Sequence, residues 1–134
     1  MINAVLEKQI IITVDNRVGT LAEISSAVAA SKINIIAMCA YAVDNRGVIM
    51  FVSDNNLRAK KLLKMKKYEL REEEVILISI KNKPGALQEV MEKIADIGVD
   101  VTLVYGSVDK EGKTSRIVLI TEDNNFVLMS LRIK

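Results

Sequence analysis

The sequence predicts an α+β protein built from two copies of a βαββαβ unit with antiparallel sheets. One short stretch occurs twice, as Asn16-Arg17-Val18-Gly19-Thr20-Leu21 and as Asn82-Lys83-Pro84-Gly85-Ala86-Leu87. A run of β-branched residues precedes each copy, and apolar residues three and four positions apart follow it. This pattern is typical of a strand that leads into an amphipathic helix. The two glycines are 85 − 19 = 66 positions apart, so the stretch marks an internal repeat.

The first half contains one full set of elements. In order, we expect a strand over 10–14, a helix after Gly19, a strand over 35–43, a turn over 44–47, a return strand over 48–53, a second helix and a fourth strand over 68–71. The first helix is expected to bury Leu21, Ile24, Ala27 and Val28. Asp54 or Asn55 is expected to cap the second helix, with Leu57, Leu62, Leu63 and Met65 on its buried side.

The second half repeats this order but lacks a closing strand. Its expected elements are a strand over 75–80, a helix that ends at Gly98 and buries Leu87, Val90, Ile94 and Ile97, strands over 99–108 and 115–121, and a short helix within 124–134. The acidic run 72–74 sets a boundary between domains at 8–73 and 74–134. Because an unfilled sheet edge is a liability, we expect residues 2–6 to supply the missing strand, joined to the strand over 10–14 by a bend.

The composition excludes several classes of function. The chain has no histidine, a single cysteine (Cys39), a net charge of +2 and few aromatic residues. These features predict no disulfide, no metal site, no cofactor, no catalytic residue and no nucleic-acid partner. No membrane span and no signal peptide are expected either. Because a single cysteine fits a reducing compartment, the sequence predicts a cytoplasmic protein.

The repeated stretch has the chemistry of a small anion site. A tight glycine turn before a helix leaves backbone N–H groups unpaired, and the helix dipole adds partial positive charge there. The carboxylate of a free amino acid fits this environment. An ordinary turn that needs glycine only for its backbone is the alternative.

The whole chain resembles two tandem ACT domains. The features that carry the resemblance are the two glycine stretches and the segments Ile33-Asn34-Ile35 and Val99-Asp100-Val101 that lead into hairpins. The resemblance implies two ferredoxin-like units. The chain is similar both to stand-alone ACT pairs and to the interlocked regulatory pair of aspartate kinases.

The resemblance also implies amino-acid sites at interfaces between ACT units. The implied ligand-binding residues are Asn16, Arg17, Val18, Gly19, Thr20 and Leu21, the repeat Asn82, Lys83, Pro84, Gly85, Ala86 and Leu87, and, from the neighbouring unit, Asn34 and Asp100. Val18 replaces the usual loop proline. Asp100 replaces an asparagine, so its carboxylate would meet the ammonium group of the ligand.

We therefore expect a non-catalytic regulatory module that binds a free amino acid and controls amino-acid metabolism. Its expected partners are the amino acid, a second copy in a homodimer, and a metabolic enzyme. The alternative is a ligand-independent regulatory or interaction subunit of a biosynthetic enzyme. RNA binding is disfavoured because only Phe51 offers a stacking surface on the central strands. A small enzyme is disfavoured because no nucleophile–base pair or metal set is present.

Overall fold

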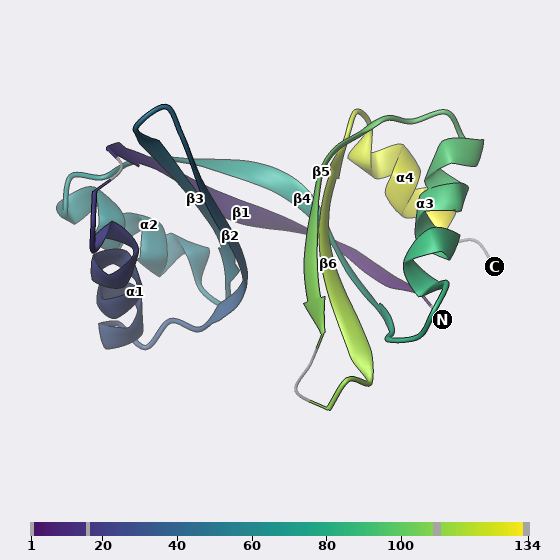
Figure 1. Cartoon of the computed structure of the whole chain (residues 1–134), viewed down its shortest axis with the longest axis horizontal. Coiled ribbons are helices and arrows are strands. Elements are labelled where there is room, and N and C mark those ends of the chain that lie inside the picture. Colours follow the sequence, from purple (N-terminus) through teal and green to yellow (C-terminus); the bar gives the residue numbers. More distant parts are fainter. Residues whose placement is uncertain (1, 16, 109–110, 133–134) are drawn as a thin grey trace. The chain divides into compact units, whose positions relative to one another are not determined.

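The computed structural model describes residues 2–15, 17–108 and 111–132. Its elements, shown in Figure 1, are β1 (Asn3–Asp15), α1 (Thr20–Ala30), β2 (Ile35–Val43), β3 (Arg46–Ser53), α2 (Asn56–Met65), β4 (Glu69–Lys81), α3 (Ala86–Asp96), β5 (Val101–Val108), β6 (Thr114–Thr121) and α4 (Asn124–Arg132). The chain divides into two compact units, Lys8–Glu73 and Met1–Glu7 with Glu74–Lys134. The expected α+β fold of two ferredoxin-like units is confirmed.

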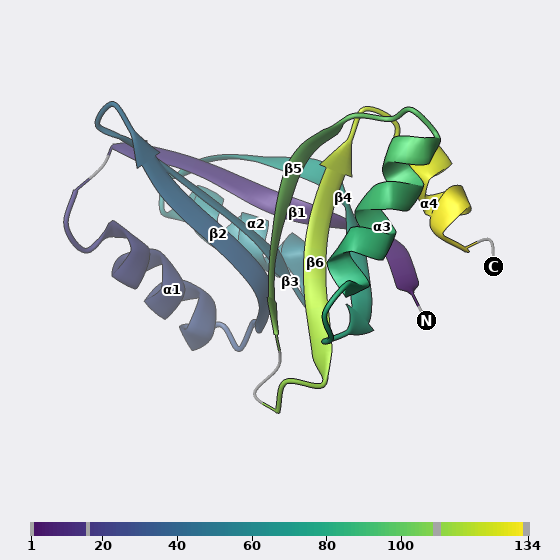
Figure 2. The same ribbon diagram turned by 45° about the vertical axis from the view of Figure 1, so that its right-hand side comes forward.

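Each unit has four neighbouring strands with two helices on one face. In the unit Lys8–Glu73 the strands lie in the order β2-β3-β1-β4, and α1 and α2 cover them. In the other unit the order is β1-β4-β6-β5, and Figure 2 shows α3 and α4 on one side of these strands. Pairs such as Ile12 with Ile49 and Ile78 with Ile117 fix the antiparallel register. Because β2 and β5 stand at the ends of these strand orders, they are the outer strands of their units.

Two strands are longer than the sequence predicts. The expected bend after residues 2–6 is wrong, because β1 runs without interruption over Asn3–Asp15. The strands expected over 68–71 and 75–80 are likewise one strand, β4. The physical reason is that each of these strands contributes to two cores. Ala4 is only 4% exposed in the core that contains Ile76, whereas Ile10 lies in the core of Lys8–Glu73.

Apart from Phe51, the residues of both cores are aliphatic. The core of Lys8–Glu73 consists of Ile10, Ile12, Ile24, Val28, Ile33, Ile49, Phe51, Ala59 and Leu63. The core of the other unit consists of Ala4, Ile76, Ile78, Ile80, Ala86, Val90, Ile94, Ile117, Leu119, Val127, Leu128 and Leu131. Ile2 and Leu6 pack against this second core. The N-terminal segment thus occupies the position of the fourth strand of the second unit.

Several residues expected in the cores are exposed instead. Leu21 and Leu87 are 42% and 51% exposed, and the buried stripes of α1 and α3 begin one residue earlier, at Thr20 and Ala86. These small residues let each helix begin close to its sheet. In α2 the buried residues are Ala59 and Leu63, while the expected core residues Leu57 and Met65 are exposed.

The local signals for turns and caps are largely confirmed. Asn55 caps α2, because its Oδ1 accepts a hydrogen bond from the Arg58 N–H at 3.1 Å. Asp44 and Asn45 both have positive φ, which makes a two-residue turn of the kind that matches strand twist. For this reason β3 begins at Arg46, two residues earlier than expected. None of the helices in the described ranges is long and apolar enough to cross a membrane.

Candidate functional site

A left-handed glycine precedes the first helix of each unit. Gly19 and Gly85 have φ of +90° and +88°, a backbone conformation that residues with a Cβ atom rarely adopt. Each carbonyl accepts the N–H four residues later, from Glu23 at 2.9 Å and from Glu89 at 3.0 Å. Neither helix has a side-chain cap. We call these two turns the Gly19 bend and the Gly85 bend.

Each bend leaves two backbone donors without a partner. In the part of the chain that the structure describes, no group accepts from the N–H of Leu21 or Ala22, nor from that of Leu87 or Gln88. Unpaired N–H groups at a helix start carry partial positive charge. Both bends therefore have the donors that a carboxylate requires.

A pocket lies beside each bend, between the start of the helix and the outer strand of the unit. The pocket at the Gly19 bend measures about 440 Å³ and is lined by Arg17, Gly19, Thr20, Leu21, Ala22, Ala40, Tyr41, Ala42, Gly47, Val48 and Ile49. The pocket at the Gly85 bend measures about 410 Å³ and is lined by Ile80, Asn82, Lys83, Ala86, Leu87, Val104, Tyr105, Gly106, Ser107, Val108, Ser115 and Ile117. Both volumes are of the size that small ligands occupy.

At the Gly19 bend a hydrogen-bonded network holds the charged side chains. The Tyr68 hydroxyl donates to Glu23 Oε1 at 2.6 Å, and Arg17 Nη2 lies 3.4 Å from Glu23 Oε2. The hydrogen bond from Tyr68 is the main cause that lowers the pKa of Glu23, and Arg17 acts in the same direction. Burial, followed by the bond to Glu23, raises the pKa of Tyr68. Arg17 is thus paired within the protein.

Replacing Tyr68 with phenylalanine is expected to reduce stability in a pH-dependent way. Glu23 has a depressed pKa, so its contribution is present above about pH 4.5 and is lost as the pH falls through its folded pKa. Tyr68 has a raised pKa, so its contribution is fully present below about pH 10.0 and is lost as the pH rises through its folded pKa. Urea unfolding should show a stability deficit of Tyr68→Phe at pH 7 that shrinks at pH 3. The exposed Tyr41→Phe is the control, and a deficit independent of pH would contradict this account.

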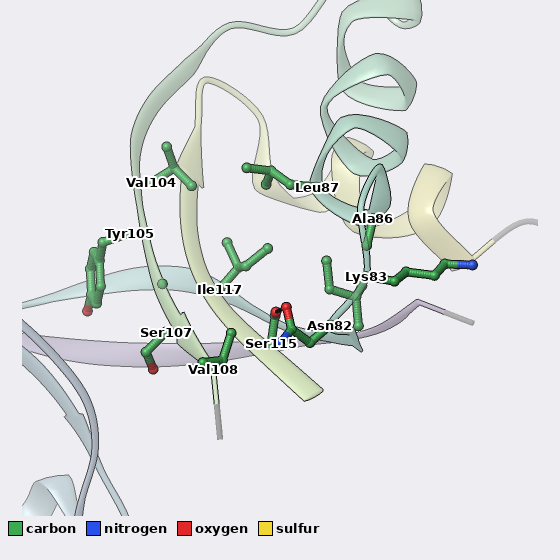
Figure 3. Close-up of a pocket in the computed structure, with 12 residues that line it drawn as sticks. Asn82, Lys83, Ala86, Leu87, Val104, Tyr105, Ser107, Val108, Ser115 and Ile117 are labelled. Carbon is green, nitrogen blue, oxygen red and sulfur yellow. Dashed lines mark hydrogen bonds between the residues drawn. The ribbon is translucent and has the colours of Figure 1, made fainter. Parts of the chain in front are cut away.

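At the Gly85 bend Asn82 holds the neighbouring hairpin turn. Its Nδ2 donates to the Gly112 carbonyl at 2.8 Å, and its Oδ1 accepts from the Ser115 hydroxyl at 3.4 Å. The Asn82 N–H donates to the Lys113 carbonyl at 3.0 Å. Figure 3 shows Asn82 at one end of the pocket and the Lys83 side chain directed away from it. Asn82 therefore shapes the pocket wall.

Asn34 and Asp100 lie at the other end of their sheets. The pairs Asp15–Arg46 and Val43–Arg46 place the Gly19 bend near the end of β2, whereas Asn34 precedes its start. Strand β2 has nine residues and therefore spans roughly 30 Å. Asn34 instead bonds to Asp54, and the Asp100 carbonyl accepts from the Glu122 N–H. Within one unit neither residue reaches the bend.

The structure brings together only part of the expected site. Of the expected residues, Arg17, Gly19, Thr20, Leu21, Asn82, Lys83, Ala86 and Leu87 line the pockets. Val18 is fully exposed, Pro84 and Gly85 stand outside the lining, and Asn16 lies outside the described residues. The pockets are also lined by outer-strand residues that are not among the expected ones, including Ala40 and Ala42 on β2 and Val104, Gly106 and Val108 on β5. Their spacing of two was the available signal, because alternate residues of a strand share a face.

The fold and the two bends define a tandem module of ferredoxin-like units with a small-ligand pocket beside each bend. The chain belongs to the ACT domain pair family, whose model matches residues 5–127. The expected resemblance is thus confirmed. A comparison with curated proteins finds no match.

Solved structures with the same fold cover nearly the whole chain. Protein BT0572 from Bacteroides thetaiotaomicron has a TM-score of 0.89 at 25% identity, over 96% of this chain and 88% of that one. The ligand-free regulatory subunit of aspartate kinase from Thermus thermophilus has a TM-score of 0.69 at 14% identity, over 97% and 93%. Aspartate kinase from Synechocystis has a TM-score of 0.69 at 15% identity, over 97% of this chain and 26% of the enzyme. At 14% and 15% identity these likenesses concern the fold alone.

Proposed function

We propose that the chain is a non-catalytic regulatory module that binds a free amino acid and controls an enzyme of amino-acid metabolism. The observation that carries the proposal is the repeated pair of unpaired N–H groups beside a pocket of ligand size. Membership of the ACT domain pair family supports it. The likeness in fold to regulatory subunits of aspartate kinase also supports it.

The bound amino acid would use both parts of the site. Its α-carboxylate would accept hydrogen bonds from the N–H groups of Leu87 and Gln88, or of Leu21 and Ala22 at the other bend. Its side chain would enter the adjacent pocket. Binding would stabilise the arrangement of the protein that has the higher affinity, which is how a ligand changes the output of a regulatory module.

A second copy would complete the site. Strands β2 and β5 are outer strands with exposed apolar residues, Tyr41 and Val43 on β2 and Val104 and Val108 on β5. An unpaired edge of this kind favours pairing with another chain. Antiparallel pairing of like edges places the start of one strand beside the end of the other. In a homodimer Asn34 or Asp100 of the second copy would then lie at a bend, where the Asp100 carboxylate would accept from the ligand ammonium group.

The test is a thermal-shift screen with each of the twenty amino acids at millimolar concentration. At least one is expected to raise the melting temperature of the full chain. The double variant Gly19→Val and Gly85→Val should abolish this response, because valine at positive φ distorts both bends. Each substitution should also cost about 1–2 kcal/mol of stability.

Gly98→Val is the matched control. Gly98 also has positive φ, with no atom within 4 Å of an added Cβ, and it follows the end of α3 far along the helix from the bend. The variant should lose similar stability yet keep the response. If no amino acid changes the melting temperature of the unaltered protein, the proposed function is wrong.

A second candidate function is a ligand-independent subunit of a biosynthetic enzyme. It is favoured by the internal hydrogen bonds of Asn82 and by Phe126 and Met129, two exposed apolar residues three positions apart on α4. Such a subunit would co-purify with its enzyme and lose it on substitution of Phe126→Ser and Met129→Ser. Amino acids would have no effect on that association.

A further inference from the structure

The outer strand of the second unit has a notch beside the Gly85 bend. Val104, Gly106 and Val108 alternate along β5 and therefore share a face. Figure 3 shows both valines on the pocket side of the strand, with Tyr105 and Ser107 on the opposite side. Gly106 has no side chain, and strand β6 approaches it closely, because an added Cβ would lie 3.3 Å from Ile117 Cγ1. We call the apolar surface formed by the two valines and this stretch of β6 the valine notch.

The walls around the valine notch are apolar. Leu87 points across the pocket from α3 toward Val104, and the buried Ile117 lies beneath, in register with Gly106. The polar side chains at the end of the pocket, Asn82 and Ser115, are hydrogen-bonded to each other. Among the residues that the structure describes, no acidic side chain belongs to the lining, and the Lys83 side chain is directed away from the pocket. Within this described part the surface of the notch is therefore apolar.

The equivalent positions at the Gly19 bend carry different side chains. By register Ala40 pairs with Ile49 as Gly106 pairs with Ile117, and Ala42 pairs with Gly47 as Val108 pairs with Ser115. Ala40 thus stands at the register position of Gly106, and Ala42, at the position of Val108, provides a lower wall than a valine. The two pockets therefore differ in the ligand side chain they accept.

We propose that the ligand of the Gly85 bend is an amino acid with a branched aliphatic side chain, of the leucine, isoleucine or valine type. Its carboxylate accepts from the N–H groups of Leu87 and Gln88, and its side chain enters the valine notch. The exposed apolar surface supports this, because Leu87, Val104 and Val108 are 51%, 45% and 55% exposed and would be covered by such a side chain. The inference rests on the proposed function and adds the ligand class and the preferred bend.

The test is a titration of the ¹⁵N-labelled full chain, followed at the amides of Leu87, Gln88, Leu21 and Ala22. L-leucine, L-isoleucine and L-valine should shift the signals of Leu87 and Gln88 at concentrations at least about tenfold lower than L-alanine, L-serine, L-aspartate or L-lysine, because one methylene in an apolar pocket is worth about 10-fold or more.

The outcomes separate this inference from the function on which it rests. If serine, aspartate or lysine binds the Gly85 bend as tightly as leucine, the ligand class is wrong and the regulatory function stands. If leucine shifts only the amide signals of Leu21 and Ala22, the assignment of this ligand to the Gly85 bend is wrong, and the regulatory function again stands. If no amino acid shifts any of the four amides, both proposals are wrong.

Isosteric variants test the notch itself. Val104→Thr and Val108→Thr each replace a methyl with a hydroxyl at a partly exposed strand position and should leave folding unchanged. Each should weaken leucine binding by about tenfold. Val43→Thr, at an exposed position of β2 outside both pockets, is the matched control and should bind leucine unchanged. If instead Val104→Thr halves the mass in solution while leucine shifts no signal of Leu87, a second copy occupies the notch and the inference is overturned.

Discussion

Deleting residues 2–7 is expected to unfold the unit formed with Glu74–Lys134 while the unit Lys8–Glu73 stays folded. The segment places Ala4 in the core and packs Ile2 and Leu6 against it. The Ala4 carbonyl also accepts hydrogen bonds from Arg132, at 3.2 Å from Nη2. Two fully buried aliphatic side chains would contribute about 3–6 kcal/mol, and Ile2 and Leu6, which are partly buried, contribute less. Even about half of this value is a large share of the stability of a small unit.

Hydrogen exchange of individual amides measures the effect of this deletion. Protection should disappear at Ile76 and Leu119 and persist at Ile12 and Phe51. Val5→Thr is the control, because Val5 is partly exposed on the same strand and should change stability by less than about 0.5 kcal/mol. A truncated protein with the original melting temperature would refute the role of the segment. The assignment of domains to 8–73 and 74–134 stays a prediction that this experiment tests.

Replacing Gly106 with valine is expected to damage both the fold and the site. A Cβ at this position would lie 2.7 Å from the Arg116 carbonyl oxygen and 3.3 Å from Ile117 Cγ1. Real Cβ atoms do not approach backbone this closely, so β5 and β6 must move apart. We expect a loss of about 1–3 kcal/mol, as in other overpacked sites. The added methyl groups would also fill the valine notch and abolish leucine binding.

The equivalent change on β2 is the control for Gly106→Val. Ala40 occupies the same register position and is exposed, so Ala40→Val should keep stability within about 0.5 kcal/mol. Urea unfolding of both variants gives the comparison. If Gly106→Val were as stable as the unaltered chain, the close approach of the two strands would not constrain this position.

Local signals predicted most of the fold. Periodicity and turn residues located the helices, the hairpins and the two glycine bends, because these depend on neighbouring residues in the sequence. They did not reveal that β1 and β4 are single long strands, since membership of two cores depends on contacts far along the chain. The charge of the acidic run 72–74 indicates a domain boundary, yet these residues lie within strand β4. There Glu72 pairs with Lys60 at 2.6 Å.

The candidate site was predictable only where chemistry is local. The two glycine stretches predict tight turns before helices, and in the structure Gly19 and Gly85 have positive φ at these turns. The outer-strand residues that line the pockets were not predictable from their side-chain chemistry, because alanine, glycine and valine have no chemical group that marks a site. Leu21 and Leu87 fit the helical period of a core, but Thr20 and Ala86 take the buried positions instead. The helical period alone does not decide which of two adjacent residues in the first turn is buried.

The bond between Arg132 and Ala4 joins residues 128 positions apart, and this has a consequence for synthesis. During synthesis, Ala4 leaves the ribosome 128 positions ahead of Arg132, and its unit can close only after Arg132 has been added. Contacts of such long range slow folding and leave apolar strands open to aggregation in the meantime. A nascent chain halted before Arg132 should therefore need a chaperone that a chain including Arg132 does not.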